Sequence, residues 1–117
     1  MIDRKRFEEG IALFNAADFF AAHEALEDVW REMQGPERQV MQGLVQVAVA
    51  LHHHSTSNPE GARSVLARAA ANVADAPDDF FGISMPPLRD ALARWQQALA
   101  ERSAPPPLPR LRTRERC

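Results

Sequence analysis

The sequence of 117 residues lacks the features that define several protein classes. Its single cysteine, Cys117, is the last residue, which excludes an internal disulfide and therefore a secreted scaffold held together by disulfides. The longest apolar run covers residues 43–51, contains Gln46 and falls far short of the roughly 20 apolar residues that a membrane-spanning helix needs. We therefore expect a protein that does not cross a membrane.

Other absences bear on partners and chemistry. The formal charge of −2 shows no excess of basic residues, which argues against nucleic acid as a partner. The N-terminus lacks the basic and apolar stretch of an export signal, so we expect a cytoplasmic protein. The sequence has no Gly-rich phosphate loop, no Gly-x-Ser-x-Gly turn and no Cys-x-x-Cys pair, and this disfavours nucleotide-binding and serine-hydrolase chemistry.

The chain is long enough for one domain, with an expected radius of gyration of roughly 13 Å. Its charge is uneven, because residues 103–117 hold four arginines and one acidic residue, which leaves a formal charge of −5 on the rest. The same segment contains four of the nine prolines, which fix φ and remove backbone N–H donors, and it has little apolar surface to bury. We expect residues 1–102 to form the folded domain and residues 103–117 to be a disordered or extended, solvated tail.

The spacing of apolar residues predicts the fold class. No segment shows the alternation of apolar and polar residues that predicts a β-strand, so we expect an all-α fold, a single compact bundle of about five helices. Residues 78–85 should form a loop that places two phenylalanines under the bundle. The expected helices are one capped by Asp3 that ends near residues 15–17, one capped by Asp18 that runs to about Met33, one over about residues 37–54, one opened by Asn58 and Pro59 that ends before Pro77, and one opened by Pro86 and Pro87.

The third helix is apolar on most of its circumference, so we expect it at the centre of the bundle. Its exceptions are Gln42, Gln46 and His53, which a helical wheel places within roughly 40° of one another. A buried polar group without a partner costs about 1 to 3 kcal/mol, so these residues should have partners. The short Gly35-Pro36 connection makes the second and third helices neighbours, and we predict a polar cluster between them.

The second helix supplies the facing residues of this cluster. His23 lies inside its apolar stripe, Glu27 lies at the edge of the stripe, and Glu24 lies about 100° further around. His23 and Glu27 could hold a divalent metal with His53 as the third ligand, and Glu24 would then be the general base of a metal-dependent hydrolase. The segment lacks the second histidine of the His-Glu-x-x-His signature. A hydrogen-bond network in which Glu27 orients His23, and acid–base catalysis without a metal, therefore remain as alternatives.

Four further aromatic or imidazole side chains have simpler interpretations. His52 and His54 point about 100° to either side of His53, so the three histidines cannot bind one metal together. We expect Trp30 and Trp95 to be packing anchors of the bundle.

Several blocks of the sequence resemble the family catalogued as domain of unknown function 309. The blocks are Phe14-Asn15, His23-Glu24-x-Leu26-Glu27-x-x-Trp30, Gln42-Gly43-x-x-Gln46, and then His53 and Asn58. The resemblance covers about residues 7–70 and implies a compact, all-helical prokaryotic protein with no established activity. It marks as signature positions His23, Glu24, Glu27, Trp30, Gln42, Gly43, Gln46, His53 and Asn58. Family members often have a basic pair and a glycine where this chain has Ser-Thr-Ser at residues 55–57, so an anion site built on that pair is not expected here.

Together these residues favour a cytoplasmic binding or structural protein whose polar His/Glu/Gln cluster lies between the second and third helices. The alternative is a metal-dependent hydrolase that uses the same cluster. A third interpretation is partner binding through an exposed apolar face, for which a homo-oligomer is the expected assembly.

Overall fold

The computed structural model of the chain describes residues 2–113 and confirms an all-α bundle. Its radius of gyration of 13.3 Å agrees with the value expected for one domain of this length. None of the helices in the described part of the chain is long and apolar enough to cross a membrane. The elements are α1 (Arg4–Asn15), α2 (Phe19–Arg31), α3 (Pro36–Ser55), α4 (Pro59–Val73), β1 (Asp79–Phe80), β2 (Ile83–Ser84) and α5 (Met85–Glu101).

Capping side chains explain where α1, α2 and α4 begin, and a Gly-Pro pair marks the start of α3. Asp3, Asp18 and Asn58 each accept a hydrogen bond from a backbone N–H in the first turn of α1, α2 and α4, which would otherwise be unpaired. α3 has no such cap and starts at Pro36, directly after Gly35. Gly35 has a φ of 74°, in the left-handed region that favours glycine. These starts match those that the sequence predicts.

Two local differences from the predictions concern segments that follow helices. α2 ends at Arg31, before the predicted Met33, although Met33 is still buried in the core. The predicted loop contains a short antiparallel hairpin, in which Phe80 pairs with Ile83. Phe80 is buried, and the ring of Phe81 packs edge-on against that of Phe7 at a centroid distance of 6.1 Å. The phenylalanines thus lie under the bundle as predicted, and the hairpin holds them there.

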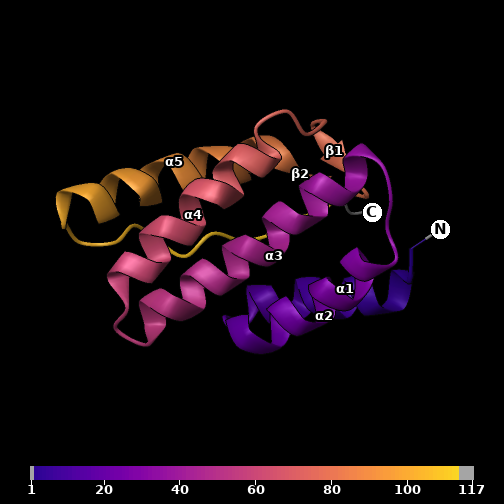
Figure 1. Cartoon of the computed structure of the whole chain (residues 1–117), viewed down its shortest axis with the longest axis horizontal. Coiled ribbons are helices and arrows are strands. Elements are labelled where there is room, and N and C mark those ends of the chain that lie inside the picture. Colours follow the sequence, from indigo (N-terminus) through magenta and orange to yellow (C-terminus); the bar gives the residue numbers. More distant parts are fainter. Residues whose placement is uncertain (1, 114–117) are drawn as a thin grey trace.

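α3 is the central element of the bundle, as its composition predicts. In Figure 1 it crosses the middle of the molecule, with α1 and α2 on one side and α4 and α5 on the other. It packs along both α2 and α4, so apolar residues are needed around nearly all of its surface. Its buried residues are Val40, Met41, Gly43, Leu44, Val45, Val47, Ala48, Ala50 and Leu51.

α3 and α4 approach each other closely at Gly43. A Cβ atom at this position would lie 2.5 Å from Cγ1 of Val73 and 3.2 Å from the carbonyl oxygen of Ala69. No side chain larger than hydrogen fits at these distances unless the two helices move apart. The glycine of the Gln-Gly-x-x-Gln block therefore sets the distance between α3 and α4.

The C-terminal segment is extended, as its prolines predict, but its described part does not lie free in solvent. After α5 the chain turns back and runs along the bundle (Figure 1). Leu111 is 1% exposed and belongs to the hydrophobic core, and its backbone forms hydrogen bonds with the side chain of Asn15. For residues 103–113 this corrects the expectation of a disordered tail with little to bury. Residues 114–117 lie outside the described residues.

Gly43→Ala is expected to lower the free energy of unfolding by about 1 to 3 kcal/mol, because the added methyl group forces α3 and α4 apart. This loss opposes the intrinsic preference of about 0.5 to 1 kcal/mol for alanine over glycine inside a helix. Urea denaturation measures the change. The matched control is Gln42→Ala at the exposed neighbouring position, which should change stability by less than about 0.5 kcal/mol. A Gly43→Ala variant as stable as the parent would contradict the close approach.

Candidate functional site

The polar stripe of α3 faces α4 rather than α2. The side chain of Gln46 is half-buried, and its Oε1 accepts a hydrogen bond of 2.7 Å from Nδ2 of Asn72 on α4. Gln42, one turn earlier, is exposed. The prediction that this stripe meets His23, Glu24 and Glu27 across the interface of α2 and α3 is therefore wrong. A helical wheel gives the angles between residues of one helix, but not which of two neighbouring helices each residue faces.

His53 and Asn58, the last two signature positions, form a pair at the turn between α3 and α4. The Oδ1 atom of Asn58 accepts the capping hydrogen bond from the backbone N–H of Gly61 at 3.0 Å, so its Nδ2 is the donor in the 3.3 Å contact with Nδ1 of His53. Nδ1 of the neutral His53 is then an acceptor, and the ring proton is on Nε2. His53 supports the cap of α4 instead of facing α2.

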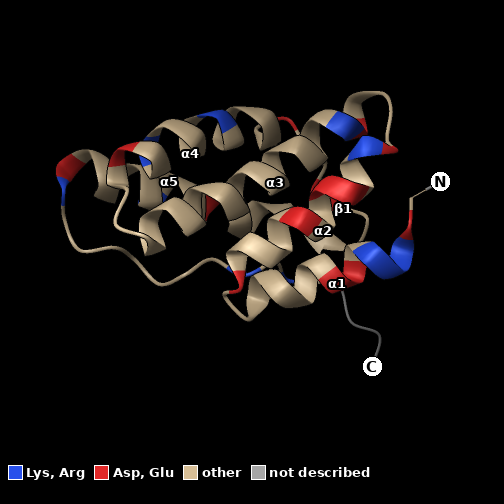
Figure 2. Cartoon of the chain, turned by 60° about the horizontal axis from the view of Figure 1, so that its bottom comes forward, with Lys and Arg blue, Asp and Glu red and all other residues tan. Residues whose placement is uncertain are grey.

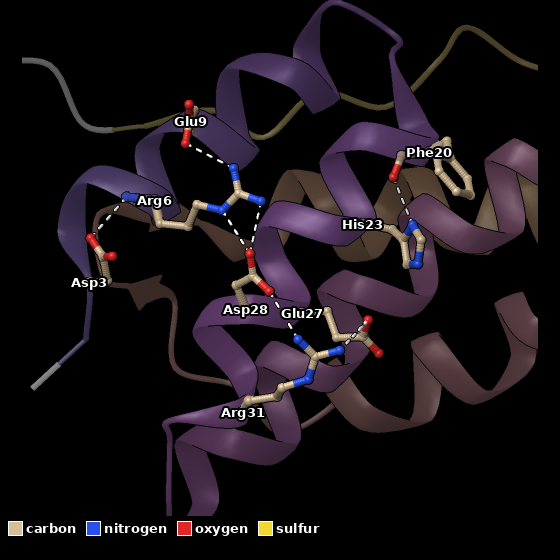
Figure 3. Close-up of polar contacts among 8 residues, drawn as sticks. All are labelled: Asp3, Arg6, Glu9, Phe20, His23, Glu27, Asp28 and Arg31. Carbon is tan, nitrogen blue, oxygen red and sulfur yellow. Dashed lines mark hydrogen bonds and ion pairs between the residues drawn. The ribbon is translucent and has the colours of Figure 1, made fainter.

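His23 has the opposite tautomer. Its Nδ1 lies 2.7 Å from the carbonyl oxygen of Phe20, one turn earlier in α2. Because a carbonyl oxygen can only accept, Nδ1 carries the proton and Nε2 carries the lone pair. Figure 3 shows the imidazole folded back onto this carbonyl. The ring is half-exposed. His23 therefore lies at the edge of the bundle and not in its interior, although it belongs to the apolar stripe of α2.

Glu27 belongs to a chain of ion pairs on the surface of α1 and α2 (Figure 3). Its Oε1 lies 3.3 Å from the guanidinium of Arg31, which also contacts Asp28 at 3.0 Å. Asp28 in turn contacts Arg6 of α1 at 2.8 Å, and hydrogen bonds to Glu9 and Asp28 raise the pKa of Arg6 above its ordinary value. Because the members are largely exposed, each pair contributes little to stability. Glu27 is thus occupied by Arg31 and does not orient His23.

The predicted metal site of His23, Glu27 and His53 is not formed. Each of the three residues has a different partner: the carbonyl oxygen of Phe20 for His23, Arg31 for Glu27, and Asn58 for His53. Among residues 2–113 no group of three or more His, Cys, Asp or Glu side chains is close enough to hold a metal ion. Glu24 is exposed on α2, as expected for a solvated carboxylate. The geometry therefore gives the hydrolase alternative no ligand set in this part of the chain.

The structure instead brings His23 and His52 together around Phe20. The ring of Phe20 lies 5.1 Å from that of His23 and 5.4 Å from that of His52, measured between centroids, and Phe20 is 51% exposed. Sequence analysis did not identify Phe20 as a site residue. The helical spacing contains the signal, because Phe19 points into the core and the adjacent Phe20 must then lie on the polar side of the helix. The geometry therefore places an exposed aromatic ring between two imidazoles at one end of α2 and α3.

The remaining signature and aromatic side chains have structural positions. The three consecutive histidines point in different directions, as predicted: His52 faces Phe20, and His54 packs edge-on against Trp95 at 5.0 Å. Trp95 is fully buried, which confirms it as a packing anchor. Trp30 is half-buried, lies 4.0 Å below the guanidinium of Arg38, and has a buried Nε1 with no hydrogen-bond partner within residues 2–113.

The tautomers of His23 and His53 can be measured directly. Long-range ¹H–¹⁵N correlation spectra of the neutral rings should show the proton of His23 on Nδ1 and that of His53 on Nε2, since one nitrogen faces an acceptor and the other a donor. Asn58→Ala should remove the preference of His53 for the tautomer protonated on Nε2. The tautomer of His23 should not change, so His23 is the internal control. The same tautomer in both rings, or a change at His23 in this variant, would contradict the assigned contacts.

Comparison with known proteins supports the resemblance that the sequence suggests. The family described as "Domain of unknown function (DUF309)" matches residues 7–65, which run from α1 into the first half of α4. An "Uncharacterized protein" of Aquifex aeolicus (strain VF5) is 36% identical over 77 residues, 65% of this chain and 23% of that protein. The "Uncharacterized protein YpuF" of Bacillus subtilis (strain 168) is 36% identical over 67 residues, 56% of this chain and 38% of that protein. The chain thus spans well under half the length of these relatives. The family match covers half of the chain, and the chain belongs to the DUF309 family.

Proposed function

We propose that this domain is a protein-binding module and that its contact site is the surface formed by Phe20, His23, Glu24 and His52, called here the Phe20 surface. The observation that carries the proposal is the exposure of Phe20, 51% of whose surface is accessible although two imidazole rings flank it. Aromatic side chains are enriched in the centres of protein interfaces, where they bury a large area with few rotatable bonds.

The polar groups around Phe20 indicate the chemistry of the partner. Glu24 forms no ion pair among the residues that the structure describes, and Nε2 of His23 carries a lone pair. Figure 2 shows acidic residues along α2, of which Glu27 and Asp28 are paired with Arg31 and Arg6, so Glu24 supplies the negative charge beside Phe20. An apolar ring beside hydrogen-bond acceptors and negative charge suits an amphipathic helix that combines apolar side chains with lysine or arginine.

The same charges argue against a symmetric pair of copies as the occupant of this surface. In a twofold dimer centred on Phe20, Glu24 of one copy would approach Glu24 of the other, because such an interface places equal patches against each other. Like charges at close range are unfavourable. A different, basic partner is therefore the occupant that we propose, and the homo-oligomer that the sequence left open is an outcome of the test.

The relatives are consistent with a module that works beside other segments. The shared region makes up 23% and 38% of the two relatives, so it is attached to further chain in both. A binding surface on one end of a rigid bundle suits this use, because it needs neither a deep cavity nor a buried titratable group.

The proposal is tested with two synthetic amphipathic helices of equal apolar pattern, one with lysine and one with glutamate at the polar positions. Titration of the ¹⁵N-labelled chain with the lysine peptide should shift the signals of His23, Glu24 and His52, and the glutamate peptide should not. Raising the salt concentration should weaken binding, because exposed charges are screened. Phe20→Ser should weaken it about tenfold or more.

Leu108→Ser is the matched control, since Leu108 is also a large, exposed apolar side chain, 49% accessible, but lies elsewhere. This variant should bind like the parent. Equal binding of both peptides, or a Phe20→Ser variant with full affinity, would overturn the proposal. A concentration-dependent dimer that Phe20→Ser abolishes would replace the basic partner with a second copy of the chain.

A further inference from the structure

The C-terminal segment, residues 104–113, lies along the bundle as an extended peptide ligand lies on the protein that binds it. Alternate side chains point inward: Pro109 and Leu111 are buried, and Leu108, Arg110 and Arg112 are exposed. This alternation is that of an extended strand with one face on a binding surface. Leu111 of this segment belongs to the hydrophobic core of the bundle.

Side chains of the bundle form hydrogen bonds with the backbone of this segment. Asn15 of α1, 96 residues away in the sequence, accepts a hydrogen bond from the N–H of Leu111 at 2.8 Å and donates one to its carbonyl oxygen at 3.1 Å. Nε1 of Trp95 donates to the carbonyl oxygen of Pro107 at 3.0 Å. A tryptophan N–H on a proline carbonyl and a paired amide on an extended backbone are contacts by which domains hold separate peptides.

The edge of the hairpin adds a third set of contacts to the same segment. The N–H of Ser84 donates to the carbonyl oxygen of Arg112 at 2.8 Å, and Ile83 forms an antiparallel bridge with Thr113. The segment thereby pairs with the free edge of β2, which is how an added strand docks on a sheet. All four of these hydrogen bonds go to backbone atoms of the segment, so they fix its direction and register, while the buried position of Leu111 selects the side chain.

The link between α5 and the docked segment is short, exposed and strained. Arg102, the first residue after α5, has a φ of 55°, in the left-handed region that a side chain makes unfavourable. Residues 102–105 are exposed, and three consecutive prolines follow from Pro105. A strained link that joins a separately docked segment to the rest of a domain favours exchange of that segment between copies.

We propose that α1, α5 and β2 form a peptide-binding groove for extended Pro-x-x-x-Leu segments, and that the C-terminal segment of a second copy can occupy it in place of the chain's own. The identical segment satisfies every contact described above, because none of them depends on its attachment to the same chain. In a single chain the chain's own segment fills the groove first, because the link to α5 keeps the local concentration of that segment high. Exchange therefore appears when that segment is weakened or when chains refold at high concentration. This groove shares no residue with the Phe20 surface, so the two proposals succeed or fail separately.

The first test uses the full chain with Leu111→Ser and a labelled peptide of the sequence of residues 104–113. The peptide should bind this variant one to one, raise its melting temperature, and bind the parent chain at least tenfold more weakly, because the parent groove is filled. A peptide with serine in place of Leu111 should lose at least tenfold in affinity, and one with serine in place of the outward-facing Leu108 should not. Equal affinity of the two altered peptides, or no binding to the folded variant, would overturn the proposal.

The second test keeps the parent sequence and covers the case in which Leu111→Ser does not fold. Two batches are labelled at the single cysteine with a donor and an acceptor dye, mixed in denaturant and refolded at increasing concentration. A dimer that shows energy transfer should form in a fraction that rises with concentration, and an excess of the peptide should suppress it. Absence of such a dimer at every concentration would contradict exchange.

Discussion

The burial of α3 on nearly all sides is the constraint on which the rest of the structure depends. α2 packs on one side of it and α4 on another, and Gly43 sets the distance to α4. A helix in this position can carry polar groups only where a neighbour offers a partner or where the helix leaves the core. Gln46 satisfies the first condition through Asn72, and the histidines at the end of α3 satisfy the second. The polar signature is therefore divided among several contacts.

This division changes the interpretation of the signature residues. Gly43, Gln46 and the pair of His53 and Asn58 determine how α3 meets α4 and where α4 begins. His23 belongs to the outer face of α2, beside Phe20 and His52. The bundle thus positions an aromatic surface at one end, while Asn15 of α1, Trp95 of α5 and the edge of β2 hold the extended segment that ends the described chain. The function that we propose, binding by surfaces that a rigid core holds in place, follows from this arrangement.

Much of the fold follows from local chemistry and could be predicted. The caps at Asp3, Asp18 and Asn58 act within one turn, so the sequence alone locates the helix starts. Which helix Gln46 faces depends on how three helices pack, and a wheel contains no such information. The position of the C-terminal segment depends on Asn15, 96 residues away, and on one buried leucine, so its composition suggested a solvated tail. Phe20 became a candidate only when the structure placed His52 beside it.

The central claim is that the polar stripe of α3 pairs with α4 and not with α2, and a double-mutant cycle tests it most directly. Unfolding free energies of Gln46→Ala, Asn72→Ala and the double variant should give a coupling energy of about 0.5 to 1.5 kcal/mol, the value of one hydrogen bond. The parallel cycle of Gln46→Ala with Glu27→Ala should give a coupling energy near zero. Coupling of Gln46 to Glu27, together with none to Asn72, would contradict the account and restore the predicted cluster between α2 and α3.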